Sequence, residues 1–171
     1  MRIRSCNFLK SFRFAFRGIV FCINKERNMR IHTVIALYVF VFSSFFHLSF
    51  TGYAVLFLTF AAVLMGEMLN TAVEYLSNAV SPAYNSAVRT VKDIAAGAVL
   101  VGAFFAVCVA VCLFREPEGF VRIGDFFRVR PGMVVLLAAV TAASAIYIAL
   151  GPPGIRDFVK RRLAGRKKHH E

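Results

Sequence analysis

The sequence predicts an all-α, polytopic membrane protein, and three observations indicate this fold class. Of the 171 residues, 58% are hydrophobic, and the mean hydropathy of +0.66 is too high for an ordinary soluble domain. Several uncharged runs are long enough to cross a bilayer as helices. Basic residues gather at the ends of these runs that would face one side of the membrane. We therefore expect a helix bundle with a surface helix at its N-terminus.

Residues 1–30 predict an amphipathic surface helix. Apolar side chains recur every three or four residues, at Phe8, Phe12, Phe16, Ile19 and Ile23. Lys10, Arg13 and Arg17 fall on a different face of this helix. A helix with one apolar and one cationic face is suited to lying among the lipid headgroups.

Four apolar runs follow, and we interpret each as a membrane span. The first covers residues 31–50, and His32 and His47 near its ends are interpreted as interfacial polar residues. The second covers residues 53–78 after a short uncharged turn, and the third covers residues 86–114. Between them Ser81-Pro82 is expected to break the helix, because proline lacks the N–H that would continue it.

The C-terminal part, residues 115–171, is predicted to be an extension of the domain formed by residues 1–114. Residues 115–132 carry charges of both signs and are interpreted as a loop. Residues 133–150 form an uncharged run just long enough for a fourth span, which the Gly151-Pro152-Pro153-Gly154 segment ends. The remaining residues form a strongly basic tail.

The distribution of positive charge predicts the orientation. Residues 1–32 contain eight Lys or Arg, the connection between the first two spans contains none, and the tail after residue 154 contains seven. With four spans, the basic segments all lie on one side, and the positive-inside rule makes that side the cytoplasm. We therefore expect the net charge of +12 to attract anionic lipid headgroups and nucleotide phosphates, and we expect no nucleic acid as a partner.

Polar residues at the cytoplasmic boundary are the candidates for a function. Glu67, Asn70, Thr71 and Glu74 share one face of the second span, at spacings of three, four and seven. Lys92 and Asp93 begin the third span, and Glu26 precedes the first. A carboxylate next to hydrocarbon costs several kcal/mol unless it is paired or hydrated, so such acids are functional candidates by default.

This set of side chains suggests metal-assisted phosphoryl transfer. Carboxylates can hold Mg²⁺ together with substrate phosphates, a lysine can neutralise phosphate charge, and a further carboxylate can deprotonate an attacking hydroxyl. The sequence contains neither a P-loop nor a kinase glycine loop. An ion- or proton-coupled transporter needs intramembrane acids too, and from the residues alone it fits nearly as well.

The motifs around these residues resemble those of the prokaryotic diacylglycerol kinase family. Its E-x-x-N-T-A-x-E signature corresponds to Glu67–Glu74, and its K-D-x-A-A-x-A-V motif corresponds to Lys92–Val99. The string Glu26–His32, E-R-N-M-R-I-H, resembles most the undecaprenol kinase branch. The resemblance covers residues 8–114, whereas residues 115–171 have no counterpart in the minimal family.

The resemblance implies an ATP- and Mg²⁺-dependent lipid kinase, assembled as a homotrimer in the inner membrane of a bacterium. Both termini and the active site would face the cytoplasm. Glu67 corresponds to the catalytic base that takes a proton from the lipid hydroxyl, and Glu26 and Glu74 correspond to the ligands of the metal–nucleotide complex. The other implied nucleotide- or substrate-binding residues are Asn70, Lys92, Asp93 and Arg17.

Two points remain open at the level of sequence. Asn78 stands where many members of the family have aspartate, which weakens a charge-based role at that position. The acceptor is either diacylglycerol or undecaprenol, since both present a primary hydroxyl at the interface. The transporter and a catalytically inactive membrane scaffold stay as alternatives, although the intact Glu67, Glu74 and Lys92 argue against the scaffold.

Overall fold

The computed structural model describes residues 4–80 and 85–167, and every regular element in these two ranges is a helix. The six helices are α1 (Arg4–Lys25), α2 (Arg27–Ser43), α3 (Phe50–Val80), α4 (Ser86–Leu113), α5 (Pro117–Val129) and α6 (Pro131–Lys167). The predicted all-α fold is confirmed. The predicted helix break at Ser81-Pro82 lies outside the described residues.

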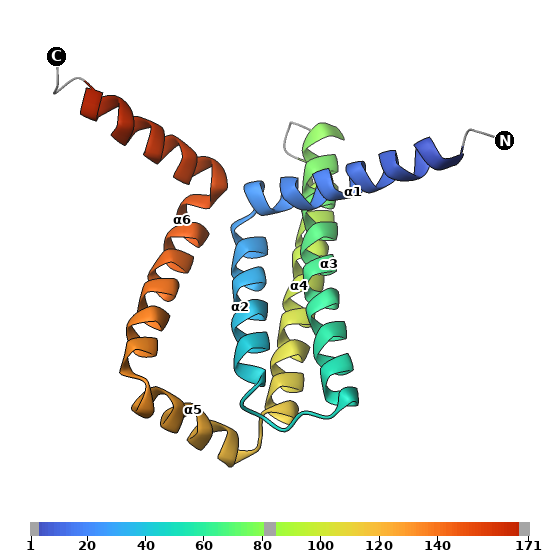
Figure 1. Ribbon diagram of the computed structural model, residues 1–171. Coiled ribbons are helices and arrows are strands. Elements are labelled where there is room, and N and C mark those ends of the chain that lie inside the picture. Colours follow the sequence, from blue (N-terminus) through green and yellow to red (C-terminus); the bar gives the residue numbers. More distant parts are fainter. Residues whose placement is uncertain (1–3, 81–84, 168–171) are drawn as a thin grey trace.

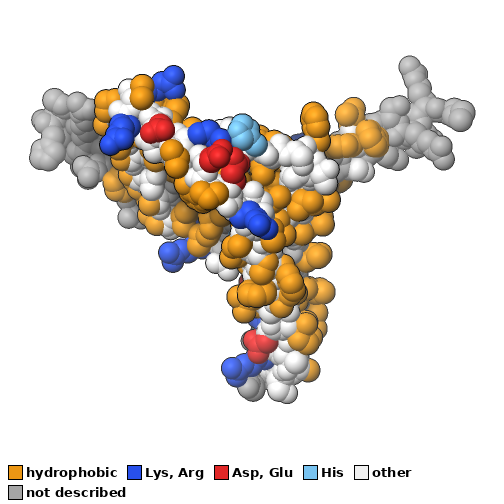
Figure 2. All heavy atoms as spheres, turned by 90° about the horizontal axis from the view of Figure 1, so that it is seen from below, with side chains coloured by type: hydrophobic (Ala, Val, Ile, Leu, Met, Phe, Trp, Pro, Cys, Tyr) orange, Lys and Arg blue, Asp and Glu red, His pale blue; other side chains and the backbone are white. Residues whose placement is uncertain are grey.

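The helices α2, α3 and α4 lie side by side, with α1 crossing one end of this bundle and α5 lying across the other (Figure 1). The membrane half of α6 runs along the outer side of α2, away from α4 (Figure 1). Three helical stretches are long and apolar enough to cross a membrane, judged by length and composition: Phe50–Val80, Ser86–Leu113 and Pro131–Phe158. The protein is therefore an integral membrane protein, and hydrophobic side chains cover much of its surface (Figure 2).

The first predicted span, residues 31–50, has the wrong bounds. The helix α2 ends at Ser43, and its 17 residues are at the lower limit for a span, with a length of about 25 Å. The hydroxyls of Ser43 and Ser44 donate to the carbonyls of Phe40 and Val41, at 2.6 and 2.8 Å, and so compete with the backbone bonds of a continuing helix. Phe50, which we placed at the end of the first span, already belongs to α3.

The predicted surface helix, residues 1–30, is also divided differently. The helix α1 ends at Lys25, and Glu26 adopts an extended backbone conformation before α2 begins at Arg27. The chain thus turns a corner at Glu26. Phe21 of α1 meets Tyr75 of α3 edge to face, with 5.7 Å between the ring centroids, so α1 packs across the end of α3.

The predicted loop at residues 115–132 is wrong, because most of it forms the helix α5. Pro117 in its first turn has the backbone angle of a helix and needs no N–H partner there. Glu118 in the first turn and Arg128 in the last turn suit the helix dipole. The mixed charges that suggested a loop are those of an amphipathic helix lying at an interface.

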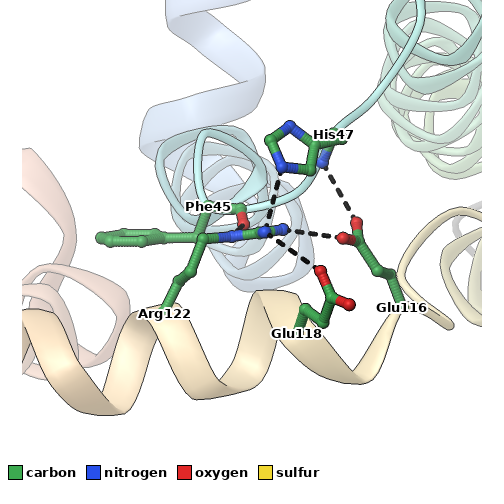
Figure 3. Close-up of polar contacts among 5 residues, drawn as sticks. All are labelled: Phe45, His47, Glu116, Glu118 and Arg122. Carbon is green, nitrogen blue, oxygen red and sulfur yellow. Dashed lines mark hydrogen bonds and ion pairs between the residues drawn. The ribbon is translucent and has the colours of Figure 1, made fainter.

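Arg122 fastens α5 to the turn between α2 and α3 (Figure 3). Its guanidinium donates to the Phe45 carbonyl at 2.6 Å and to the Glu116 carboxylate at 3.0 Å, and it lies 3.0 Å from Nε2 of His47. The backbone N–H of His47 donates in turn to Glu116 at 3.3 Å. These contacts give the extension a fixed position on the end of the bundle away from α1.

The predicted end of the fourth span at the Gly-Pro-Pro-Gly segment is instead a kink at Gly151 within α6. Gly151 has φ 65° and ψ 170°, which is outside helical geometry, and Pro152 and Pro153 follow it. The chain becomes helical again beyond the kink and stays so to Lys167, so the basic tail is a helix along most of its length. Tyr38 and Thr141 share a hydrogen bond of 3.0 Å between their hydroxyls, which joins α2 to α6.

Candidate active site

Glu67 lies in the second half of α3 and is almost completely enclosed, with 1% of its surface exposed. Its Oε1 atom lies 3.2 Å from Nε2 of His32, which comes from the first turns of α2. The Thr71 hydroxyl donates at 2.9 Å to the Glu67 carbonyl, one turn along the same helix. The bundle therefore buries a carboxylate and gives it a histidine as its neighbour.

The site contains polar atoms that the described part of the protein leaves without hydrogen-bond partners. Neither carboxylate oxygen of Glu67 has a partner with hydrogen-bond geometry there, although His32 is within ion-pair distance. The same holds for the Oδ1 atom of Asn70, which is buried on the same face of α3. Buried polar atoms in native proteins are almost always paired. Three such atoms together are therefore candidates to bind a ligand.

Two further carboxylates belong to the same group. Glu26, at the corner between α1 and α2, and Glu74, two turns after Glu67, are both half-buried and close enough for their charges to act on Glu67. The structure thus brings together the three acids that the sequence singles out. No cluster of three or more His, Cys, Asp or Glu with metal-ligand geometry occurs among the described residues. Magnesium needs only one or two carboxylates together with water and substrate phosphates, so Glu26 and Glu74 stay candidate ligands for that ion.

The remaining candidate site residues lie further from Glu67, towards the surface of the protein. The Lys92 ammonium donates to Oδ1 of Asn78 at 2.6 Å, which joins α4 to α3 just beyond Glu74. Asp93 is exposed and lies 3.9 Å from Arg89 on the same helix. Arg17 is also exposed, with its guanidinium over the ring of Phe14. The structure therefore places Lys92 at the α3–α4 junction and leaves Asp93 and Arg17 on the surface of the single chain.

An apolar cavity of about 290 Å³ lies between α2, α3 and α4. Leu56, Phe60 and Val63 line it from α3, and Ala103 and Ala106 line it from α4. His32, the neighbour of Glu67, is the one ionisable residue among those that line it. The cavity therefore has apolar walls and reaches the histidine beside the buried carboxylate.

His32 is the residue whose position the sequence interpretation missed. A histidine near the end of an apolar run is usually an interfacial residue, and the interpretation followed that rule. In the structure, the packing of α2 against α3 brings it to Glu67, although the two residues are 35 positions apart in the sequence. Its position within the Glu26–His32 string was the available signal.

Comparison with known proteins places this site in a family. The family model of prokaryotic diacylglycerol kinase matches residues 13–114, which include Glu26, Glu67, Glu74 and Lys92. The chain belongs to the prokaryotic diacylglycerol kinase family. The matched region ends at the close of α4, so α5 and α6 lie outside the part that defines the family.

Two relatives are similar along this same region. A diacylglycerol kinase of Synechocystis sp. (strain ATCC 27184 / PCC 6803 / Kazusa) is 41% identical over 112 residues, which cover 65% of this chain and 64% of the relative. An undecaprenol kinase of Bacillus subtilis (strain 168) is 32% identical over 107 residues, which cover 63% of this chain and 87% of the relative. The chain therefore matches slightly less than two thirds of the Synechocystis protein. No solved structure matches the chain.

Proposed function

We propose that this member of the diacylglycerol kinase family is a lipid kinase that transfers the γ-phosphate of ATP to the hydroxyl of a membrane lipid alcohol. The observation that carries the proposal is the enclosed Glu67 carboxylate, next to a histidine that also lines an apolar cavity. A lipid alcohol has both parts that such a site would recognise, a polar hydroxyl and a hydrocarbon body. Family membership favours this kinase over the transporter and the inactive scaffold.

In the proposed reaction, Glu67 accepts the proton of the lipid hydroxyl. The hydroxyl oxygen forms a bond to the γ-phosphorus, the bond from that phosphorus to the β,γ-bridging oxygen breaks, and ADP leaves with the bridging oxygen. The Glu67 oxygens have no hydrogen-bond partner among the described residues, so they are available to accept from a hydroxyl. His32 would hold the Glu67 carboxylate in one orientation through their 3.2 Å contact.

The nucleotide would bind beside these residues as a magnesium complex. Glu26 and Glu74 are the ligands we propose for Mg²⁺, which would neutralise charge on the transferred phosphate. The Lys92 ammonium, within reach of α3 at Asn78, would contact the phosphates. We propose Asn70, whose Oδ1 atom is buried, and the exposed Asp93 and Arg17 as further nucleotide- or substrate-binding residues.

The acceptor lipid is diacylglycerol or undecaprenol, the two alcohols implied by the names of the relatives. The protein would work in the cytoplasmic membrane of a bacterium, with Glu26, Glu67 and both termini on the cytoplasmic side. We propose a homotrimer as its assembly, as the resemblance to the family implies.

The test is phosphate transfer by purified protein in mixed micelles, with labelled ATP, Mg²⁺ and either diacylglycerol or undecaprenol. We expect label on one of the two lipids, and we expect Glu67→Gln to lower the rate by at least about 100-fold, because the amide cannot accept the proton. Asp125→Asn is the matched control, since it removes an exposed acid on α5, at the other end of the bundle. A folded wild-type protein that labels neither lipid would refute the proposal.

A further inference from the structure

Arg30 is a buried cation whose partners are backbone carbonyls. Only 6% of its surface is exposed, and it forms no ion pair with an acid among the described residues. Its Nε atom donates to the carbonyl of Ile148 in α6 at 3.1 Å. Its Nη1 atom donates to the carbonyls of Ile23 and Asn24 in α1, at 3.1 and 3.3 Å. One guanidinium on α2 therefore bonds to two other helices.

These carbonyls lack partners within their own helices, because α1 ends there and α6 is kinked there. The carbonyls of the last turn of a helix have no intrahelical partner, and Ile23 and Asn24 lie in the last turn of α1. In α6, the carbonyl of Ile148 would normally accept from the N–H of residue 152, but Pro152 has none. The kink in α6 thus creates an acceptor, and Arg30 supplies the donor. A cation also suits the negative end of each helix dipole.

Gly151 lets the guanidinium come this close. A Cβ atom at this position would lie 3.0 Å from Nη1 and 3.1 Å from Cζ of Arg30. The φ of +65° is moreover one that residues with a side chain rarely adopt. Both the kink and the contact therefore depend on glycine at residue 151.

The same contacts hold the corner that carries Glu26. Arg30 is anchored one turn into α2, and it bonds to the carbonyls of the last turn of α1, so it bridges across Glu26 from one side to the other. Across this corner the backbone N–H of Glu26 donates to the Cys22 carbonyl at 2.8 Å. A residue that fixes both sides of a turn also fixes the direction of the side chain at its apex.

We infer that the C-terminal extension is part of the catalytic machinery: through Arg30, the kink of α6 holds the α1–α2 corner and so positions Glu26 for the magnesium–nucleotide complex. Arg30 is then a positioning residue. The role given to Glu26 rests on the proposed function, whereas the link from α6 to the corner rests on the contacts of Arg30 alone. The extension would act on nucleotide binding although it lies outside the region that the family model matches.

The test uses the full-length variant Gly151→Ala, with Gly132→Ala as matched control. Both change a glycine of α6 to alanine, but a Cβ at residue 132 would meet no atom within 4 Å, and the φ of Gly132 is not positive. Hydrogen exchange of the amides of residues 22–30 reports on the corner, and the dissociation constant of a non-hydrolysable magnesium–ATP analogue reports on Glu26. Arg30→Lys is a second variant, because lysine keeps the charge but cannot donate in the guanidinium's directions.

We expect Gly151→Ala and Arg30→Lys to speed exchange in residues 22–30 and to raise the dissociation constant of the analogue about tenfold, and Gly132→Ala to do neither. Faster exchange confined to α6 would overturn the inference, and so would a mobile corner with unchanged nucleotide affinity. If the wild type bound no nucleotide at all, the proposed function would fail. The exchange of residues 22–30 would then still decide whether α6 holds the corner.

Discussion

Glu67 and His32 together form the most enclosed ionisable contact in the described part of the chain. Carboxylates at such a depth are costly unless a partner or a ligand compensates them. His32 is the neighbouring polar side chain that the protein supplies, and it comes from a different helix. The orientation of the carboxylate therefore depends on how α2 packs against α3.

We predict that His32→Asn lowers kcat for lipid phosphorylation by about 10- to 100-fold, because Glu67 loses the side chain that orients it. His47→Asn is the control, since His47 contacts Arg122 at the opposite end of α2. The measurement is the kinase assay at saturating lipid and ATP. Equal loss in the two histidine variants would mean that His32 supports only the fold.

At the same scale, the sequence identified most of the polar site. The one-turn spacings within Glu67–Glu74 placed the side chains on one face, because the helix period fixes the directions of neighbouring residues. The contact of His32 with Glu67 was not predicted, because a contact between helices has no signature in local spacing. The exposed position of Asp93 was not predicted either, since exposure depends on which helices pack against each other, whereas that of Arg17 agrees with the cationic face predicted for residues 1–30.

At the scale of elements, α5 shows how closely the extension is fitted to the bundle. Gly119 is buried, and a Cβ atom at this position would overlap the ring of Phe46. That ring is itself held edge to face by Phe114 and Phe120, so it has little freedom to move away. The contact explains why glycine is needed at this position in the first turn of α5.

We predict that Gly119→Ala destabilises the protein by about 1–3 kcal/mol through overpacking. Gly124→Ala in the same helix should be neutral or stabilising by up to about 1 kcal/mol, because its Cβ meets no atom and alanine favours the helix. Thermal or denaturant unfolding in detergent measures both. Similar effects of the two substitutions would contradict the packing of α5 on Phe46.

The Glu116 contact predicts a dependence on pH. The hydrogen bond from Arg122, followed by that from the His47 backbone, lowers the pKa of Glu116 below its ordinary value of 4.5. A lowered pKa in the folded state stabilises the protein above the ordinary value, and this stabilisation is lost as the pH falls through the folded pKa. We therefore expect the Tm advantage of the wild type over Glu116→Gln to be constant above about pH 5 and to shrink at lower pH. A difference that stays the same down to pH 3 would contradict this prediction.

At the scale of the whole molecule, the arrangement of α1 and α5 indicates the membrane boundaries. The two helices lie across opposite ends of the bundle (Figure 1), and both are amphipathic. Such helices lie in the headgroup region. The corner at Glu26 and the helical tail after Gly151 are at the α1 end, joined through Arg30.

We predict that α5 lies outside the cytoplasm and that both termini lie inside it, because the positive charge is concentrated at the α1 end. In a variant whose native cysteines have been replaced, Asp125→Cys should react with a membrane-impermeant thiol reagent in cells whose envelope outside the inner membrane has been made permeable. Lys160→Cys should react only after the inner membrane is opened. The reverse pattern would invert the orientation and place Glu26 and Glu67 away from cytoplasmic ATP.

The sequence by itself determined the helical class, the long apolar segments, an interruption of the last apolar helix at Gly151 and the acids on one face of α3, because hydropathy, helix period and proline chemistry are local properties. Only the tertiary structure decided that His32 meets Glu67, that residues 117–129 form a helix against the α2–α3 turn, and that Arg30 joins α6 to the Glu26 corner. These are contacts between residues 35 to 118 positions apart. They exist because helices packed together leave particular carboxylates and carbonyls without partners, and a distant residue supplies the donor.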